Sequence, residues 1–322
     1  MPQLSRREFV VTAASASAIL GLDGPFAFIA PADAQKAVDA AAKGFHTVKN
    51  GSVEITTLYD GLWEKAHDAG FIKNATLEET KAALKAAGLT DAHVPITFTV
   101  TVVKSGGKTV MFDSGTGGQL SPLAGKLGDN MKAAGIDPKS ISTVVITHFH
   151  ADHIFGLMEK DTNAQTYPDA EIVVPKAELA YWNDPGVFAK LPEARHGLAK
   201  RIQATLGQWK NVRPVEGEVE VAPGVKALPA FGHTAGHTTY VVDGAKPLMV
   251  LADLTNIPAL FVKNPGWHAQ FDADAALAEA NRRKLFDRAI ADKAMVTGYH
   301  YGMPGAGTIQ KDGNGYAFVP VV

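Results

Sequence analysis

The feature that most constrains the fold of this sequence is a short apolar segment that ends in a cluster of histidines and aspartate. Residues 142–147 (STVVIT) are nearly continuous in apolar and β-branched residues, which is typical of a strand buried on both faces. Four residues of metal-binding type follow within six positions: His148, His150, Asp152 and His153. In an extended segment His148 and His150 project to the same side and can hold one ion. Asp152 and His153 follow where the chain turns toward a helix, so they can face a second ion.

Three more residues of the same type each come directly after a predicted strand: His233, Asp253 and His300. Side chains at strand ends are placed by a rigid scaffold, which a defined metal geometry needs. The chain contains no cysteine, so disulfides, thiolate ligands and a cysteine nucleophile are all excluded, and any metal must bind to His, Asp or Glu. The sequence therefore predicts a metal site built from the ends of several strands.

The rest of the chain alternates between strand and helix patterns. A polar and apolar alternation over residues 52–59 predicts a strand that ends in a turn at Asp60-Gly61, and residues 96–103 and 109–112 predict a hairpin. Thr76 and Glu79 have the spacing of a capping box at the start of a helix. Further strands are expected at residues 171–174, 225–229, 238–242, 247–251 and from 295 onward, and helices at residues 76–87, 120–134, 176–182, 195–207 and 272–292. This order favours two packed sheets with helices on their outer faces.

Composition and charge exclude several classes of partner. A length of 322 residues with 46% hydrophobic content can fill one large core, and no linker or repeat divides it. The formal net charge of −2 leaves no basic surface for nucleic acid, so we expect a small-molecule substrate instead. We leave a homodimer open as the assembly.

The first 34 residues have the pattern of an export signal. Ser5-Arg6-Arg7-Glu8-Phe9 precedes a mildly apolar stretch, and Ala32-Asp33-Ala34 offers small residues before a cleavage point at Gln35. This resembles a twin-arginine signal. The stretch contains Asp23 and several polar residues, so it is too weakly apolar for a stable membrane anchor. We therefore expect residues 1–34 to be a signal, residues 35–322 to be one domain, and the mature protein to be periplasmic or secreted.

Taken together, HxHxDH at residues 148–153, GHTxGH at residues 232–237, a strand-terminal Asp and a late His resemble the metallo-β-lactamase superfamily. The resemblance covers nearly all of the mature chain and implies an α+β fold, a four-layered αββα sandwich with the site at one edge of the two sheets. It also implies two divalent metal ions per chain, expected to be Zn²⁺. On this resemblance the first ion binds His148, His150 and His233, the second binds Asp152, His153 and His300, and Asp253 bridges them. His237 is then expected to support the ligands, and the Asp113-Ser114-Gly115 turn is expected to be structural.

The resemblance implies a hydrolase in which hydroxide held between the two ions attacks the substrate, with Asp152 as a candidate catalytic proton donor. β-Lactamases with a Cys ligand are excluded by composition, and the other di-zinc subclass lacks the bridging Asp. Only 22 residues follow His300, which does not suit the helical extension of glyoxalase II-like thioesterases, and the 47 residues from Asp253 to His300 leave no room for the inserted domain of the nucleases.

Residues 271–274, 281–283 and 299–305 resemble the branch of methyl parathion hydrolase and its lactonase relatives, although Gly302-Met303 departs from that branch's His-x-Pro-Phe-Pro-Gly. Small, mostly apolar esters, lactones or phosphotriesters are the expected substrates. A glyoxalase II-like thioesterase, a redox enzyme using iron and a non-catalytic di-metal protein remain as alternatives. Six aromatic residues are candidates for lining an apolar pocket: Phe149, Phe155, Trp182, Phe188, Phe261 and Trp267.

Overall fold

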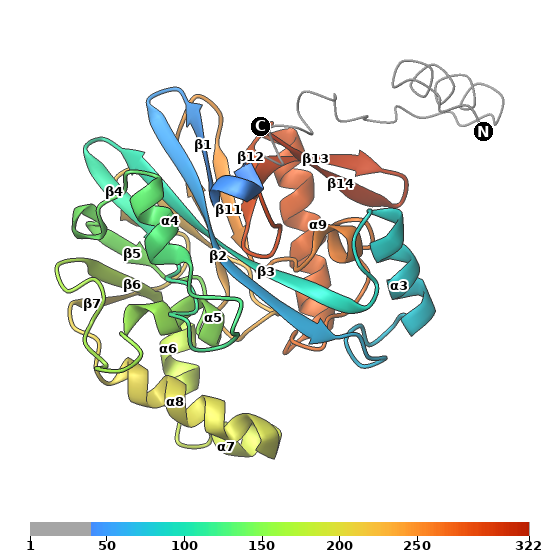
Figure 1. Ribbon diagram of the computed structural model, residues 1–322, viewed down its shortest axis with the longest axis horizontal. Helices are drawn as coiled ribbons and strands as arrows, with labels where there is room; N and C mark the ends of the chain where they lie inside the picture. The colour runs from blue at the N-terminus through green and yellow to red at the C-terminus, as the bar shows by residue number, and fades with distance from the viewer. Residues whose placement is uncertain (1–39, 322) are drawn as a thin grey trace. The chain divides into compact units, whose positions relative to one another are not determined.

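The computed structural model describes residues 40–321 (Figure 1). The expected export signal at residues 1–34 lies outside the described residues. No helix within residues 40–321 combines the length and the apolar character that crossing a membrane requires.

Two seven-stranded sheets form the centre of the described domain (Figure 1). The first has the order β1-β2-β3-β4-β5-β6-β7, with β1 Phe45–Asn50, β2 Val53–Ala66, β3 His93–Ser105, β4 Lys108–Phe112, β5 Thr143–Val145, β6 Glu171–Pro175 and β7 Val212–Val215. The second has the order β14-β13-β12-β11-β10-β9-β8, with β8 Glu220–Ala222, β9 Val225–Pro229, β10 Thr238–Val242, β11 Leu248–Ala252, β12 Met295–Gly298, β13 Ala306–Asp312 and β14 Gly315–Pro320. Each sheet thus comes from one half of the chain.

Helices cover the outer face of each sheet. They are α3 Leu77–Ala86, α4 Leu127–Ala133, α5 Ala151–Ile154, α6 Lys176–Asn183, α7 Val187–Lys190, α8 His196–Leu206 and α9 Ala275–Ala291, together with the π-helical turn η4 Pro258–Val262. Figure 1 shows α9 beside the second sheet and α6 to α8 at the far edge of the first.

Three apolar clusters correspond to the three interfaces between these layers. Val103 and Phe112 of the first sheet pack with Tyr240 and Val250 of the second between the sheets. A second cluster joins the outer face of the first sheet to its helices, and a third joins the second sheet to α9. The predicted α+β fold and its four-layered αββα arrangement are therefore confirmed.

Most local predictions agree with the structure. Thr76 caps α3 with the reciprocal capping box that its spacing to Glu79 predicted, and β3 and β4 form the expected antiparallel hairpin. The helix predicted over residues 120–134 is wrong in its first half, since only Leu127–Ala133 is helical. Pro122 and the left-handed Gly125 interrupt it. The short strands β1, β7 and β8 carry little periodic signal and were not predicted.

The turn predicted at Asp60-Gly61 is also wrong, because β2 continues through it to Ala66. The register between β2 and β3 shifts between Tyr59 and Gly61, so these residues form a bulge within the strand. Gly61 has φ +136°, and a Cβ there would collide with the carbonyl oxygen of Leu123. Glycine is therefore required at this position.

Candidate metal centre

All seven predicted site residues follow strand ends at one edge of the sandwich. His148 and His150 lie in the loop after β5, and His150 is the N-cap residue of α5, so Asp152 and His153 fall in its first turn. His233 lies between β9 and β10, Asp253 directly follows β11, and His300 comes two residues after β12. Strands β11 and β12 are parallel, so the segments that carry Asp253 and His300 leave the second sheet side by side. The structure brings all seven residues together in two groups, which can be described separately.

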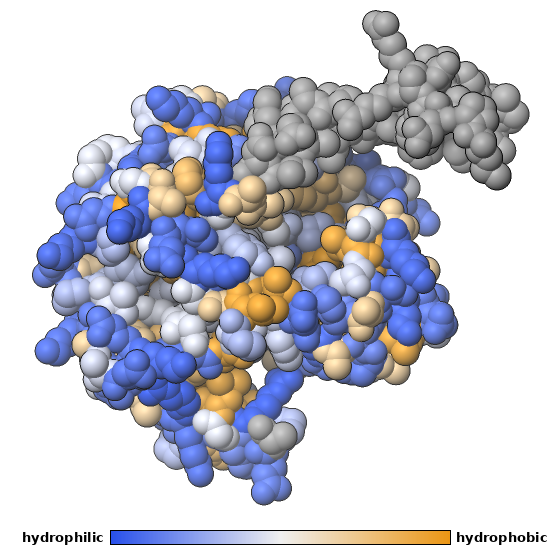
Figure 2. Space-filling model, in the orientation of Figure 1, coloured by the Kyte–Doolittle hydropathy of each residue, from blue (hydrophilic) through white to orange (hydrophobic). Residues whose placement is uncertain are grey.

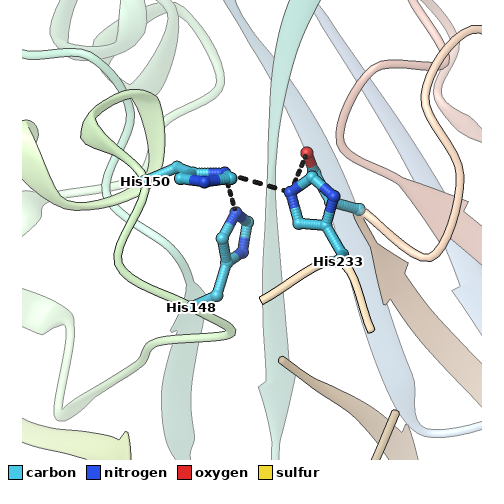
Figure 3. Close-up of side chains that lie close together, drawn as sticks. His148, His150 and His233 are labelled. Atoms are coloured by element: carbon cyan, nitrogen blue, oxygen red, sulfur yellow. Dashed lines mark hydrogen bonds and ion pairs between the residues drawn. The ribbon is translucent and has the colours of Figure 1, made fainter. Parts of the chain in front are cut away.

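The first group contains His148, His150, His233 and Asp253, whose ligand-type atoms lie within 4.8 Å of one another. Figure 3 shows the three imidazoles converging, His148 and His150 from the loop after β5 and His233 from the loop after β9. His150 Nδ1 lies 2.9 Å from His148 Nε2 and 3.0 Å from His233 Nε2. Asp253 Oδ2 lies 3.3 Å from His233 Nε2. Four atoms able to bind a metal ion thus lie close together.

The outer hydrogen bonds of these rings decide which nitrogens carry a hydrogen. His233 Nδ1 lies 2.9 Å from Asp272 Oδ1, and a carboxylate can only accept, so His233 Nε2 presents a lone pair. The Thr147 hydroxyl donates to a carboxylate and must accept from His148 Nδ1, which leaves His148 Nε2 as a lone pair too. Both lone pairs face His150 Nδ1, which carries at most one hydrogen. This convergence of acceptors favours a cation.

Burial strengthens this arrangement by keeping the rings neutral. Burial, with the neighbouring His233 imidazole adding to it, lowers the pKa of His150 to about 3. Burial likewise lowers the pKa of His148 well below its ordinary value. Neutral imidazole is the form that binds a metal ion, so these rings are prepared as ligands at neutral pH.

The second group contains Asp152, His153 and His300. His153 Nε2 lies 3.4 Å from Asp152 Oδ2 and 3.2 Å from Asp253 Oδ1. His300 Nε2 lies 3.0 Å from Asp253 Oδ2, and its Nδ1 donates to the carbonyl oxygen of Thr97 at 2.7 Å. Asp253 therefore contacts histidines of both groups, which is the position that a bridging carboxylate needs.

Charge balance differs in this second group. Burial lowers the pKa of His153, but the carboxylates of Asp152 and Asp253 outweigh it and raise that pKa well above its ordinary value. The same opposition, with Asp253 as the main carboxylate, raises the pKa of His300. The two carboxylates thus favour protonated forms of the two imidazoles. A divalent cation bound here can supply the same positive charge in place of those protons.

Two buried atoms make the fit to metal explicit. His153 Nε2 and Asp253 Oδ1 are sealed from solvent, and although they lie 3.2 Å apart, neither makes a hydrogen bond of suitable geometry within residues 40–321. Such atoms are rare in folded proteins, and one belongs to each of the two groups. Nitrogen and carboxylate donors in this number suit two ions such as Zn²⁺.

A layer of buried polar residues orients the ligands, and the sequence analysis missed most of it. Asp113 Oδ2 lies 2.7 Å from His153 Nδ1 and also accepts from Thr147, so this turn is more than structural. Asp272 holds His233, and Arg282 contacts Asp272 at 3.4 Å. Both residues lie in segments that the sequence singled out only for their resemblance to relatives.

Glu178 carried no signal in the sequence. Its carboxylate accepts from the backbone N–H groups of Phe149 and Gly236 at 3.2 and 2.7 Å, and so ties the first histidine loop to the second. His237 lies behind the ligands, as expected. Its Nδ1 donates to the carbonyl oxygen of Ala230, and its Nε2 accepts from the backbone N–H of Asp253 at 3.2 Å, so that lone pair is used. The five other histidines of residues 40–321 lie outside both groups.

A cavity of about 870 Å³ opens over the two groups, and His150, Asp152, His233, Asp253 and His300 line it. Five large apolar side chains at its wall are 36–42% exposed: Trp63, Leu120, Leu198, Phe231 and Leu277. In Figure 2 apolar surface gathers in the hollow between the α7–α8 region and the rest of this face. Apolar side chains exposed together around a cavity are typical of a ligand-binding site.

The prediction of the lining aromatics was largely wrong. Of the six candidates only Trp182 lines the cavity. Phe149, Phe155 and Phe261 are buried in the core against the first sheet, and Phe188 and Trp267 pack on that core. Closeness in sequence to the metal-ligand candidates does not determine whether an aromatic side chain faces the cavity or the core. The aromatic residues that line the cavity with Trp182 are Trp63, Phe98, Tyr181, Phe231 and Phe271.

The sequence profile of the metallo-beta-lactamase superfamily matches residues 99–295. The chain belongs to this superfamily, and the expected membership is confirmed. Two curated relatives are N-acyl homoserine lactonases, one from Bacillus sp with 26% identity over 156 residues and one from Bacillus cereus with 25% identity over 158 residues. Each match covers 48% of this chain, and the chain spans about half, 54%, of the length of these relatives.

Solved structures match over more of the chain. AidC, a dizinc quorum-quenching lactonase in complex with an N-hexanoyl-L-homoserine product, has 25% identity and a TM-score of 0.79, covering 87% of this chain and 98% of AidC. The hydrolase AbOPH has 23% identity and a TM-score of 0.80 over the same shares, which supports the fold alone.

Proposed function

We propose that the protein is a binuclear-metal hydrolase that opens lactones and cleaves small, mostly apolar esters. The observation that carries this proposal is the pair of donor groups joined by Asp253 at the floor of an apolar-rimmed cavity. The assignment of His148, His150 and His233 to one ion and of Asp152, His153 and His300 to the other belongs to the same proposal. Zn²⁺ is the proposed metal.

Divalent ions held here would supply a water-derived nucleophile near neutral pH and polarise the carbonyl oxygen of the substrate. The chain's own residues do the rest. Asp113, Asp272 and His237 fix the orientation of the ligands, which keeps their geometry unchanged when substrate enters.

Asp152 is proposed to move a proton to the leaving oxygen. Its side chain is 19% exposed and reaches the cavity, and its backbone carbonyl accepts from the Tyr299 hydroxyl at 2.6 Å. Burial raises the pKa of Asp152, but the neighbouring His153 and His300 imidazoles outweigh it and lower that pKa below its ordinary value. The carboxylate is therefore ionised at neutral pH and able to accept a proton before passing it on.

The apolar rim supports the substrate class. Lactones and esters with aliphatic or aromatic substituents can bury them against Trp63, Leu198 and Phe231. The acyl homoserine lactonase relatives favour lactones within this class, whereas a phosphotriester is favoured only by the resemblance in sequence. A hydrolysis screen of lactones, aryl esters, phosphotriesters and a glutathione thioester with zinc-loaded protein tests the proposal. A preference for the thioester would contradict it.

We also propose that the protein is exported in folded form through its Arg6-Arg7 signal and cleaved before Gln35. Replacing both arginines by lysine should keep the protein in the cytoplasm. N-terminal sequencing of the periplasmic fraction tests the cleavage point, and periplasmic activity that the replacement leaves unchanged would contradict the export proposal. A homodimer stays a prediction that light scattering tests.

A further inference from the structure

Asn256 is a nearly buried polar residue close in sequence to the candidate metal ligand Asp253. It lies three residues after Asp253, in the segment between β11 and the η4 turn, and it lines the same cavity as Asp253 and His300. The residue is only 8% exposed. A polar side chain that is buried to this extent and still borders a cavity is a candidate for contact with a ligand.

The carboxamide has a defined orientation. The backbone N–H of Ile257 donates to Asn256 Oδ1 at 3.1 Å, and since a backbone N–H can only donate, the oxygen must be the atom that faces it. The amide nitrogen Nδ2, with two hydrogens, points elsewhere. Within residues 40–321 Nδ2 donates to no acceptor. It still retains contact with solvent, since it is absent from the set of fully buried atoms without a partner. Nδ2 is therefore a free donor that is not sealed from solvent, on a side chain that lines the cavity.

The backbone that carries Asn256 is held at several points. Arg282 Nε donates to the carbonyl oxygen of Leu254 at 3.0 Å, and the hydroxyls of Thr255 and Tyr301 are 2.6 Å apart. Ile257 is buried and begins the η4 turn. A donor held in this way loses little freedom when it binds, so its hydrogen bond is directed in advance.

The chemistry of the cavity gives this donor a role. An ester or lactone presents only acceptor oxygens, so it needs a donor from the protein. The cavity lining includes the donors Lys73, Lys190 and Gln270 besides Asn256, but Asn256 is the one that follows the bridging candidate Asp253 by three residues. We propose that Asn256 is a substrate-binding residue whose Nδ2–H donates to an oxygen of the bound ester or lactone and so orients it over the metal centre. This inference rests on the proposed function.

The test compares Asn256→Ala and Asn256→Asp with the wild type. Both variants remove the donor, and Asn256→Asp keeps an acceptor for the Ile257 N–H, so a loss common to both does not come from that backbone contact. We expect kcat/KM for γ-decalactone and an aryl ester to fall about tenfold to a hundredfold in both variants, with metal content unchanged. Asn264→Asp is the matched control, because Asn264 Nδ2 donates to the carbonyl oxygen of Leu260 and does not line the cavity.

A binding measurement separates this role from a structural one. Calorimetry with 4-hydroxydecanoate, the ring-opened form of γ-decalactone, should show affinity weakened about fivefold or more by Asn256→Ala and unchanged by Asn264→Asp. Wild-type kcat/KM and affinity in Asn256→Ala would overturn the role of Asn256 alone. A wild-type protein that hydrolyses no lactone or ester would overturn the proposed function and this inference with it.

Discussion

Arg282 is expected to stabilise the candidate centre from behind, and replacing it by Met tests this. Its guanidinium is 2% exposed and donates to the carbonyl oxygens of Leu254, Pro265 and Trp267 at 3.0, 2.8 and 2.9 Å. It also contacts Asp272 Oδ2 at 3.4 Å, and Asp272 in turn holds His233. One side chain thus connects the Asp253 segment with the segment that orients a ligand of the first group.

The size of the effect follows from these contacts. Arg282→Met keeps the volume but leaves Asp272 as an uncompensated buried charge and three carbonyl oxygens without donors. Removing one partner of a buried ion pair costs about 3–5 kcal/mol. We therefore expect the free energy of unfolding to fall by about this amount, and the Tm by roughly 6–15 °C in a domain of this size.

Urea and thermal unfolding of chelator-treated protein measure this loss without the contribution of metal binding. Arg288→Met is the control, since Arg288 is on the exposed face of the same helix and, among residues 40–321, pairs with Asp292 alone. That change should cost no more than about 0.5 kcal/mol. An Arg282→Met protein as stable as Arg288→Met would refute the proposed role of the buried guanidinium.

Three further predictions follow from the contacts described above. Asp113→Ala should weaken metal binding at the second group about 10- to 100-fold in a chelator competition, because His153 Nδ1 loses its partner; unchanged affinity would show that this contact is dispensable. Gly61→Ala should destabilise the fold by about 1–3 kcal/mol in urea titrations, because the new methyl group meets the Leu123 carbonyl, whereas Gly128→Ala in open space within α4 should stabilise it by up to about 1 kcal/mol. Equal effects at the two glycines would contradict this reasoning. Thr76→Ala should cost about 1 kcal/mol of stability by removing the α3 cap, and a shift below about 0.3 kcal/mol would argue against the capping box.

The strand-end ligands could be predicted because their signal is local. His148, His150, Asp152 and His153 are adjacent in sequence, and each later candidate follows an apolar run that reads as a buried strand. The helix predicted over residues 120–134 is wrong in its first half because the prediction relied on the spacing of apolar residues. Pro122 and Gly125 interrupt helical geometry there, and the structure follows them.

The residues that orient the ligands could not be predicted in the same way. Glu178 acts on Phe149 and Gly236, which are 29 and 58 residues away, and Asp272 reaches His233 across 39 residues. Such partners are chosen by tertiary packing, so nothing in the neighbouring sequence marks them. Asp113 had a partial signal, since its turn was recognised, but the contact to His153 depends on two strands that meet only in the folded sheet. The cavity wall depends in the same way on side-chain direction, which explains why most of the chosen aromatics belong to the core.

The most direct test of the central claim is the metal content of purified protein and its Asp253→Ala variant, measured by mass spectrometry beside lactone hydrolysis. We expect about two ions per wild-type chain, and a loss of both metal and turnover in Asp253→Ala, because this carboxylate contacts both groups. One ion per chain at saturation, or full lactonase activity in Asp253→Ala, would contradict the binuclear centre.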